Sequence, residues 1–210
     1  MKRGIIWDLD GTLWDSSTPV RDAWNAWMER HGFDRRFTRE QMRGYCGKTL
    51  EQIAALVFPD VPEAERNARV YGCCDLENEF LAERGGILYP QERQVLCRLA
   101  EQYHMSIVSN CGQGYIEAYL TAHHMWPLFD DRENAVNTGM GKAENIRLVM
   151  ERNGLDCAVY VGDTQGDWQA ATRAGAVFVH AAYGFGQAPE AEWRIASLTE
   201  LPAVLERIFS

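Results

Sequence analysis

Short apolar runs recur along the chain, each followed by a polar or glycine-containing turn. They occupy residues 4–7, 105–108, 158–161 and 176–179. Runs of this length are typical of strands buried on both faces of a parallel sheet. Apolar positions at helical spacing follow them and predict helices at residues 113–123, 142–153, 168–174 and 198–209. Alternation of strand and helix predicts an α/β fold, to which residues 129–136 add one weakly patterned strand.

A different pattern fills the stretch between the first apolar run and the second. Residues 20–31, 39–45, 50–58 and 62–84 carry apolar side chains three and four positions apart, which predicts amphipathic helices. Gly85 and Gly86 then break the pattern. An insertion after the first strand lies over the carboxyl ends of the strands, where open α/β sheets bind their ligands. The sequence therefore predicts a Rossmann-like parallel-sheet core, residues 1–15 and 88–210, with an all-helical cap, residues 16–87.

Composition and charge narrow the class of protein. The 210 residues are 46% hydrophobic, with a formal net charge of −9. A negative surface repels nucleic-acid backbones and anionic membranes, so we expect neither as a partner. No uncharged apolar stretch approaches the ~18 residues of a membrane span, and the run at residues 4–7 is too short for a secretory signal. The six cysteines lack metal-binding spacing, which indicates free thiols in a cytoplasmic protein.

The first candidate for chemistry is the sequence DLDGTLWD at residues 8–15, directly after the first predicted strand. The carboxylates of Asp8 and Asp10 point to the same side because the two residues are two positions apart. Carboxylates held that close repel each other unless a cation lies between them or one is protonated. Mg²⁺ with oxygen ligands is the usual cation beside a phosphate. Taken alone, the motif also fits an acid-rich turn that starts a helix at Gly11 and Thr12.

A second acidic pair follows the predicted strand at residues 158–161. Asp163 and Asp167 are four positions apart and share a face if a helix begins near Thr164. Helix capping is the alternative, because the first turn of a helix tolerates Asp well. Both acidic pairs follow strands of the same predicted sheet, so they converge on one edge of it.

Two further segments offer groups that could bind an anion. Ser109 and Asn110 follow the apolar run at residues 105–108, where a hydroxyl and the amides of a coming helix suit an anion. Lys142 begins a predicted helix, where its charge opposes the helix dipole and could neutralise a phosphate. Polar residues also end strands routinely, and a solvated lysine is the plain alternative.

Taken together and in this order, the four motifs resemble those of the haloacid dehalogenase-like superfamily. The resemblance extends from Asp8 to about Gly186, and it is closest to the branch with a helical cap after the first strand. Phosphoglycolate phosphatases and β-phosphoglucomutases belong to that branch. The resemblance implies a Mg²⁺-dependent phosphatase that hydrolyses a small phosphorylated metabolite of the phosphoglycolate or sugar-phosphate type.

The resemblance also implies a role for each matching residue. Asp8 attacks phosphorus and forms an aspartyl-phosphate, and Asp10 protonates the leaving oxygen and later deprotonates the attacking water. The phosphoryl oxygens are bound by Thr12, Ser109, Asn110 and Lys142. The metal is held by Asp8, the main-chain carbonyl of Asp10, Asp163 and Asp167.

Other activities of the same superfamily fit less well. Dehalogenases attack carbon and generally lack the second Asp of the first motif, which is present here as Asp10. β-Phosphoglucomutases carry a His shortly after that motif and an Arg in a cap loop. Residues 16–20 contain no His, and the loop at residues 46–49 contains Lys48 instead of Arg. We therefore favour hydrolysis over a phosphomutase, and both over a catalytically silent binding protein.

Three features outside the motifs carry narrower expectations. Lys48 lies between two predicted cap helices and is a candidate contact for the part of the substrate beyond its phosphate. Trp24 is expected to pack in the core of a cap helix together with Trp27. Residues 183–186, YGFG, form either a loop near the site or an ordinary turn.

The substrate stays open among phosphoglycolate, a sugar phosphate, pyrophosphate and a nucleoside monophosphate. For the oligomeric state, a monomer is mildly preferred.

Overall fold

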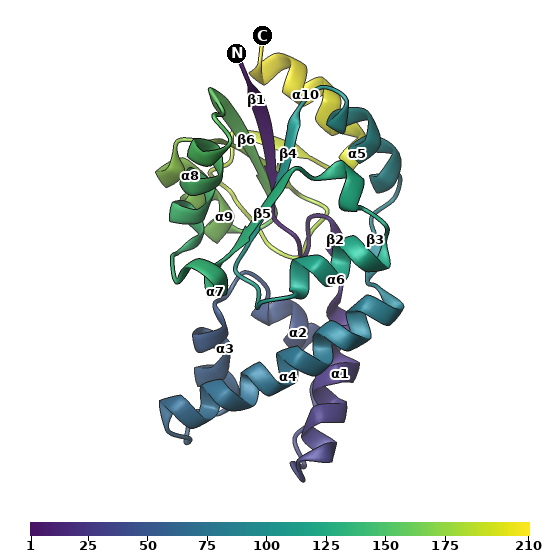
Figure 1. Cartoon of the computed structure of the whole chain (residues 1–210), viewed down its shortest axis with the longest axis vertical. Coiled ribbons are helices and arrows are strands. Elements are labelled where there is room, and N and C mark those ends of the chain that lie inside the picture. The colour runs from purple at the N-terminus through teal and green to yellow at the C-terminus, as the bar shows by residue number, and fades with distance from the viewer.

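A computed structural model describes the whole chain, residues 1–210, and shows a parallel sheet with a group of helices beyond one end of it (Figure 1). The sheet has six strands in the order β5-β4-β1-β6-β7-β8, and each neighbouring pair is parallel. The strands are β1 (Arg3–Trp7), β4 (His104–Ser109), β5 (Asp131–Asn134), β6 (Cys157–Gly162), β7 (Val177–Ala181) and β8 (Trp193–Ile195). The first strand of the chain therefore lies inside the sheet.

Helices cover both faces of the sheet (Figure 1). Successive residues of a strand point to opposite faces, so Ile5 joins one buried apolar cluster and Ile6 joins another. The cluster around Ile5 includes α5 (Glu92–Ala100) and α10 (Leu201–Ile208), and the cluster around Ile6 includes α8 (Lys142–Arg152) and α9 (Gln165–Ala174). The remaining elements are α6 (Tyr115–Ala122), η1 (Trp126–Leu128), α7 (Ala135–Thr138) and η2 (Leu198–Glu200).

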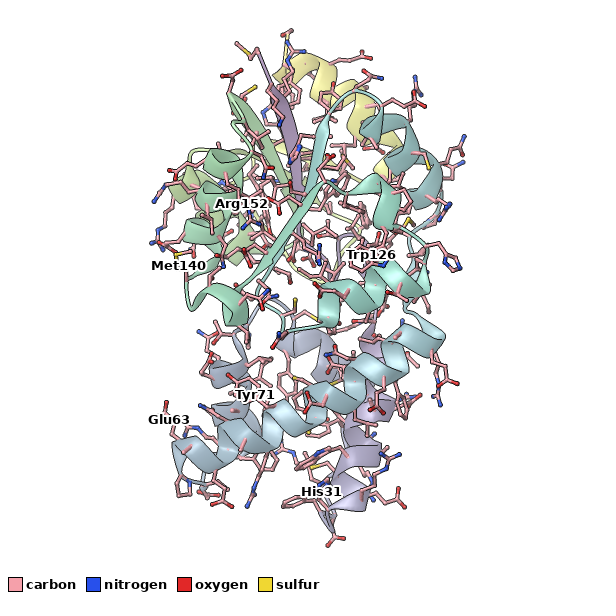
Figure 2. The ribbon with its side chains drawn as sticks, viewed as in Figure 1. His31, Glu63, Tyr71, Trp126, Met140 and Arg152 are labelled. Atoms are coloured by element: carbon pink, nitrogen blue, oxygen red, sulfur yellow. The ribbon has the colours of Figure 1, made fainter.

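Four helices form the cap: α1 (Ser17–Arg30), α2 (Arg39–Tyr45), α3 (Leu50–Val57) and α4 (Glu63–Arg84). Figure 2 shows His31, just after α1, and Glu63, at the start of α4, far from the sheet. Thr38 and Thr49 begin α2 and α3 with capping boxes, in which the threonine oxygen accepts the amide N–H of the residue three positions on. The starts of these two helices are thus fixed by local sequence.

A two-stranded antiparallel ribbon connects the cap to the sheet. It consists of β2 (Trp14–Asp15) and β3 (Ile87–Leu88), so the chain leaves and re-enters the core at adjacent points. Trp14 in this ribbon is fully buried and belongs to the same apolar cluster as Ile5 and Trp24. Because that cluster runs from the sheet through the ribbon into the cap, the two parts pack against each other in this structure.

The structure confirms the predicted α/β fold with an inserted group of helices. Each predicted strand and cap helix is present with boundaries close to those expected. The division into a core, residues 1–15 and 88–210, and a cap, residues 16–87, stays a prediction. The ribbon strands β2 and β3 lie at its two boundaries. No helix of the structure has both the length and the apolar character that a membrane crossing requires.

Several local predictions were wrong or incomplete. The strand expected over residues 129–136 ends at Asn134, because the Asn134 side chain accepts the amide N–H of Asn137 at 2.9 Å and starts α7 there. The helix expected over residues 198–209 is divided into η2 and α10, with Pro202 in the first turn of α10. Helix α5, strand β8 and the connecting ribbon were not predicted.

Candidate active site

Three acidic side chains from separate segments meet at the carboxyl end of the sheet. Asp8 follows β1, Asp163 follows β6, and Asp167 lies in the first turn of α9. All three are buried, and their ligand atoms lie within 4.8 Å of one another. The two acidic pairs predicted from the sequence therefore do converge, except that the Asp10 carboxylate lies outside this cluster.

Lys142 is the cation beside these acids. Its Nζ donates to Asp8 Oδ1 at 2.8 Å and to Asp167 Oδ1 at 2.6 Å, and its side chain is buried. Burial alone would lower the pKa of Lys142, but Asp167 and Asp8 outweigh it and hold that pKa well above its usual range. Lys142 is thus a permanent positive charge in contact with the predicted nucleophile.

One lysine does not balance three carboxylates. Burial and the charges of Asp167 and Asp163 together raise the pKa of Asp8 to about 8, against the opposing effect of Lys142. Burial and Asp167 likewise raise the pKa of Asp163 to about 7. Carboxylates in such surroundings ionise fully only when additional positive charge is supplied.

The hydrogen bonds of Asp163 leave room for a cation. Its Oδ2 accepts the amide N–H groups of Phe185 at 2.7 Å and Gly186 at 3.0 Å. Its Oδ1 is buried and has no hydrogen-bond partner. An unsatisfied carboxylate oxygen among further carboxylates is the type of donor set that Mg²⁺ prefers. The residues present therefore fit a divalent metal ion.

Asp10 lies beside the acidic cluster in a separate hydrogen-bond network. Its Oδ1 accepts Ser16 Oγ at 2.5 Å and the Tyr115 hydroxyl at 2.9 Å, and Tyr115 also donates to Ser16 at 2.8 Å. Burial raises the pKa of Asp10, and the hydrogen bonds from Ser16 and Tyr115 oppose that rise. A fixed carboxyl group that keeps its proton more readily than usual suits a general acid.

A cavity lies between the cap and the core, next to Asp10. Including its open mouth it has a volume of about 610 Å³, which is within the range of small-molecule sites. The core contributes Asp10, Ser109 and Asn110, and the cap contributes Lys48 together with apolar side chains such as Leu50. Lys48 therefore shares a cavity with the predicted acid, and its contact with the substrate stays a prediction.

The predicted phosphate-binding residues do not all face this cavity. Ser109 is buried and lines it, while Asn110 donates its side-chain N–H to the main-chain carbonyl of Gly47 at 3.0 Å and so connects the core to the cap. Thr12 is fully buried and its hydroxyl has no partner. Thr12 and Lys142 lie away from the cavity lining, with Lys142 beside Asp8.

Residues 183–186 form a loop at the site. The Tyr183 hydroxyl donates to the Thr12 carbonyl at 2.8 Å, and the next residues bind Asp163 through their amides. Phe185 also lies under the guanidinium of the cap residue Arg43, 4.9 Å from its ring centre. The same loop therefore touches the first motif, an acid of the buried cluster of Asp8, Asp163 and Asp167, and the cap.

Gly184 in this loop has no room for a side chain. A Cβ atom there would lie 2.3 Å from the Gly11 carbonyl oxygen and 2.4 Å from Asp163 Cβ. We expect Gly184→Ala to displace both segments, with a loss of about 1–3 kcal/mol in stability and at least about 10-fold in kcat. Thermal unfolding and steady-state kinetics measure the two effects. Gly44→Ala is the matched control, because a Cβ there meets nothing within 4 Å.

Three contributors to this site were not found from the sequence. Ser16 and Tyr115 hold Asp10, and Glu77 of α4 lines the cavity. Ser16 directly follows the first motif, which was a usable signal. Nothing in the local sequence distinguishes Tyr115 or Glu77 from other residues of amphipathic helices.

The arrangement of these residues can be compared with known proteins. The family model described as haloacid dehalogenase-like hydrolase matches residues 5–181. The chain belongs to this family. The match includes all four motifs, so it confirms the resemblance inferred from them.

Curated relatives carry phosphatase names. The phosphoglycolate phosphatase of Aliivibrio fischeri is 26% identical over 192 residues, which cover 86% of this chain and 84% of the relative. The phosphoglycolate phosphatase of Synechococcus elongatus is 27% identical over 191 residues, covering 87% and 85% of the two chains.

Solved structures share the fold along almost the whole chain. A haloacid dehalogenase-like hydrolase from Streptococcus pneumoniae superposes with a TM-score of 0.82 at 21% identity, covering 98% of each chain. CbbY from Rhodobacter sphaeroides, solved as a mutant in complex with xylulose-(1,5)bisphosphate, gives 0.79 at 19% identity and covers 96% of each chain. At these identities the similarity establishes the fold alone.

Proposed function

We propose that this protein is a Mg²⁺-dependent phosphatase that hydrolyses a small phosphate monoester through an aspartyl-phosphate on Asp8. The observation that carries the proposal is the contact of a buried carboxylate, Asp8, with the buried cation Lys142 at 2.8 Å, next to a separately held acid. The names of the curated relatives support a substrate of the phosphoglycolate type, and the ligand of CbbY supports a sugar phosphate. Six free cysteines favour a cytoplasmic enzyme.

In this mechanism Asp8 needs no general base, because its carboxylate acts as a nucleophile once it is ionised. Lys142 holds Asp8 in one orientation and faces the phosphoryl group with a positive charge. Ser109, which lines the cavity, is a further hydroxyl donor for the phosphoryl oxygens. A bound Mg²⁺ would supply the positive charge that offsets repulsion between the carboxylate and the phosphate; we assign its binding to Asp8, the Asp10 carbonyl, Asp163 and Asp167.

Asp10 transfers protons in both halves of the reaction. Ser16 and Tyr115 fix one of its carboxylate oxygens, and Asp10 lines the cavity. In the first half Asp10 gives its proton to the leaving alkoxide oxygen, and in the second half it takes a proton from the water that attacks the aspartyl-phosphate. The enzyme thereby returns to its starting protonation state.

A phosphate-release screen tests the proposed function. We expect the protein to release inorganic phosphate from phosphoglycolate or from sugar phosphates with Mg²⁺ present, and to stop when EDTA removes the metal. We also expect millimolar Mg²⁺ to raise the melting temperature without any substrate, since a ligand that binds only the folded state stabilises it. Absence of phosphate release from every ester, or conversion of a hexose phosphate to its isomer without free phosphate, would contradict the proposal.

A further inference from the structure

A buried acid of the cap lies in the wall of the cavity. Glu77 belongs to α4, and its side chain is 6% exposed. The indole N–H of Trp24 donates to its Oε2, and this is the one hydrogen bond that the Glu77 side chain makes with the protein. Trp24 also lines the cavity. Besides packing in the cap, it therefore orients the carboxyl group of Glu77.

The surroundings of Glu77 give no reason to expect that its buried carboxyl group stabilises the fold. Val20, Leu50 and Ile53 line the same cavity, as does Lys48, but Glu77 takes part in none of the ion pairs of the structure. A carboxyl group among apolar side chains costs several kcal/mol unless its polar atoms are bonded. Burial accordingly raises the pKa of Glu77 to about 8. An apolar residue of similar size would pack there at lower cost.

The unused oxygen of Glu77 is open to the cavity. Oε2 is bonded to Trp24, whereas Oε1 has no protein partner and is not among the fully enclosed polar atoms of the structure. The carboxyl group is also near Asp10, whose charge contributes to its raised pKa. A substrate with its phosphate at Asp8 and its leaving oxygen at Asp10 would therefore place the first atoms of its organic part close to Glu77.

The chemistry of Glu77 limits what those atoms can be. In either protonation state a carboxyl oxygen accepts a hydrogen bond from a hydroxyl group. A substrate carboxylate has no hydrogen to donate and is repelled when Glu77 is ionised, so it can bind only to the O–H of the protonated form. An apolar substrate group would leave Oε1 unbonded in a dry pocket. A hydroxyl group donates to the ionised form and both donates to and accepts from the protonated form, so it matches Glu77 in either state.

We propose that Glu77, oriented by Trp24, is a specificity residue that accepts a hydrogen bond from a substrate hydroxyl, so that the preferred substrates are polyol or sugar phosphates. The proposal rests on the proposed phosphatase function and narrows its substrate class. It departs from the substrate named for the curated relatives, because phosphoglycolate carries a carboxylate in place of hydroxyls.

The test compares esters that differ in this group. The specificity constant, kcat/KM, is measured with Mg²⁺ for glycerol phosphate, a pentose phosphate, a hexose phosphate, propyl phosphate, phosphoglycolate and phosphoethanolamine. For the wild type we expect the best hydroxyl-bearing ester to exceed both propyl phosphate and phosphoglycolate by at least about 10-fold. In Glu77→Leu we expect the ratio of that ester to propyl phosphate to fall by about 10- to 100-fold.

Two further variants make the result specific. Glu77→Gln keeps an acceptor for Trp24 and nearly the same volume, and it is expected to lower the same ratio by about 3- to 10-fold. It serves as the test if Glu77→Leu does not fold. Glu79→Leu is the matched control on the exposed side of α4, and it is expected to leave all ratios unchanged.

The outcomes separate this inference from the proposed function. If no ester is hydrolysed by the wild type, the phosphatase function itself fails. If esters are hydrolysed but phosphoglycolate or an amine-bearing ester such as phosphoethanolamine is preferred, the assignment of a hydroxyl-bearing substrate is overturned. If both Glu77 variants keep the wild-type ratios, Glu77 is a structural partner of Trp24 only, and its role in specificity is overturned.

Discussion

Asp8→Asn is expected to abolish phosphate release, with a loss of at least about 10⁴-fold in kcat. The amide is a poor nucleophile toward phosphorus, and it also removes the negative partner of Lys142 at 2.8 Å. Incubation of the wild type with substrate, followed by rapid acid quenching and mass spectrometry, should detect a phosphorylated peptide that contains Asp8. The variant should give no such peptide.

The fold of this variant is expected to remain intact. Asparagine has the shape of aspartate, and removing one of three clustered carboxylates relieves repulsion among them. Circular dichroism and thermal unfolding check this point. Asp60→Asn, on the exposed surface of the cap, is the control for an Asp-to-Asn change and should keep full activity. Turnover by purified Asp8→Asn protein at a rate near that of the wild type would falsify the assignment of the nucleophile.

Lys142→Met is expected to reduce both stability and activity strongly. Met fills a similar volume but leaves Asp8 and Asp167 buried without their cation, a change that typically costs about 3–5 kcal/mol. Loss of a positive charge that stabilises the transferring phosphoryl group is expected to lower kcat by a further factor of about 10²–10³. Denaturant unfolding gives the first quantity and kinetics at saturating substrate give the second.

A matched control for this prediction lies on the same helix. Arg147 of α8 is exposed, so Arg147→Met changes the net charge by the same amount away from the site. It should alter stability by less than about 0.5 kcal/mol and leave kcat unchanged. If Lys142→Met were as active and stable as the Arg147 variant, the buried lysine would have no role in holding the acids or the phosphate.

The sequence was sufficient to predict the sheet, the cap and the acidic site because these depend on strong local patterns. An apolar run that ends in Asp8, and another that ends before Asp163, place acids at strand ends wherever the helices lie. The cap helices α2 and α3 begin at threonines whose capping signals are local. Features of this kind can be predicted from one sequence without an alignment of homologues.

Other features depended on contacts between distant segments. The ribbon strands β2 and β3 have two residues each, too few for any periodicity, and they form because Trp14 and Leu88 are brought together across the cap. Tyr115 is 105 positions from the Asp10 it holds, and Glu77 is 53 positions from Trp24. Each is an ordinary member of an amphipathic helix until its partner is known.

The position of β1 inside the sheet has a consequence for how the chain folds. This strand is made first, but its two neighbours are β4 and β6, which end at Ser109 and Gly162. During synthesis the segment that carries Asp8 therefore has no sheet partner until residue 109 is made, and one edge of β1 stays unpaired until residue 162 is made. The cap helices, whose contacts are local, can form before it. An unpaired apolar strand is prone to aggregation, so a nascent chain stalled before residue 157 should bind chaperones more strongly than the complete chain does.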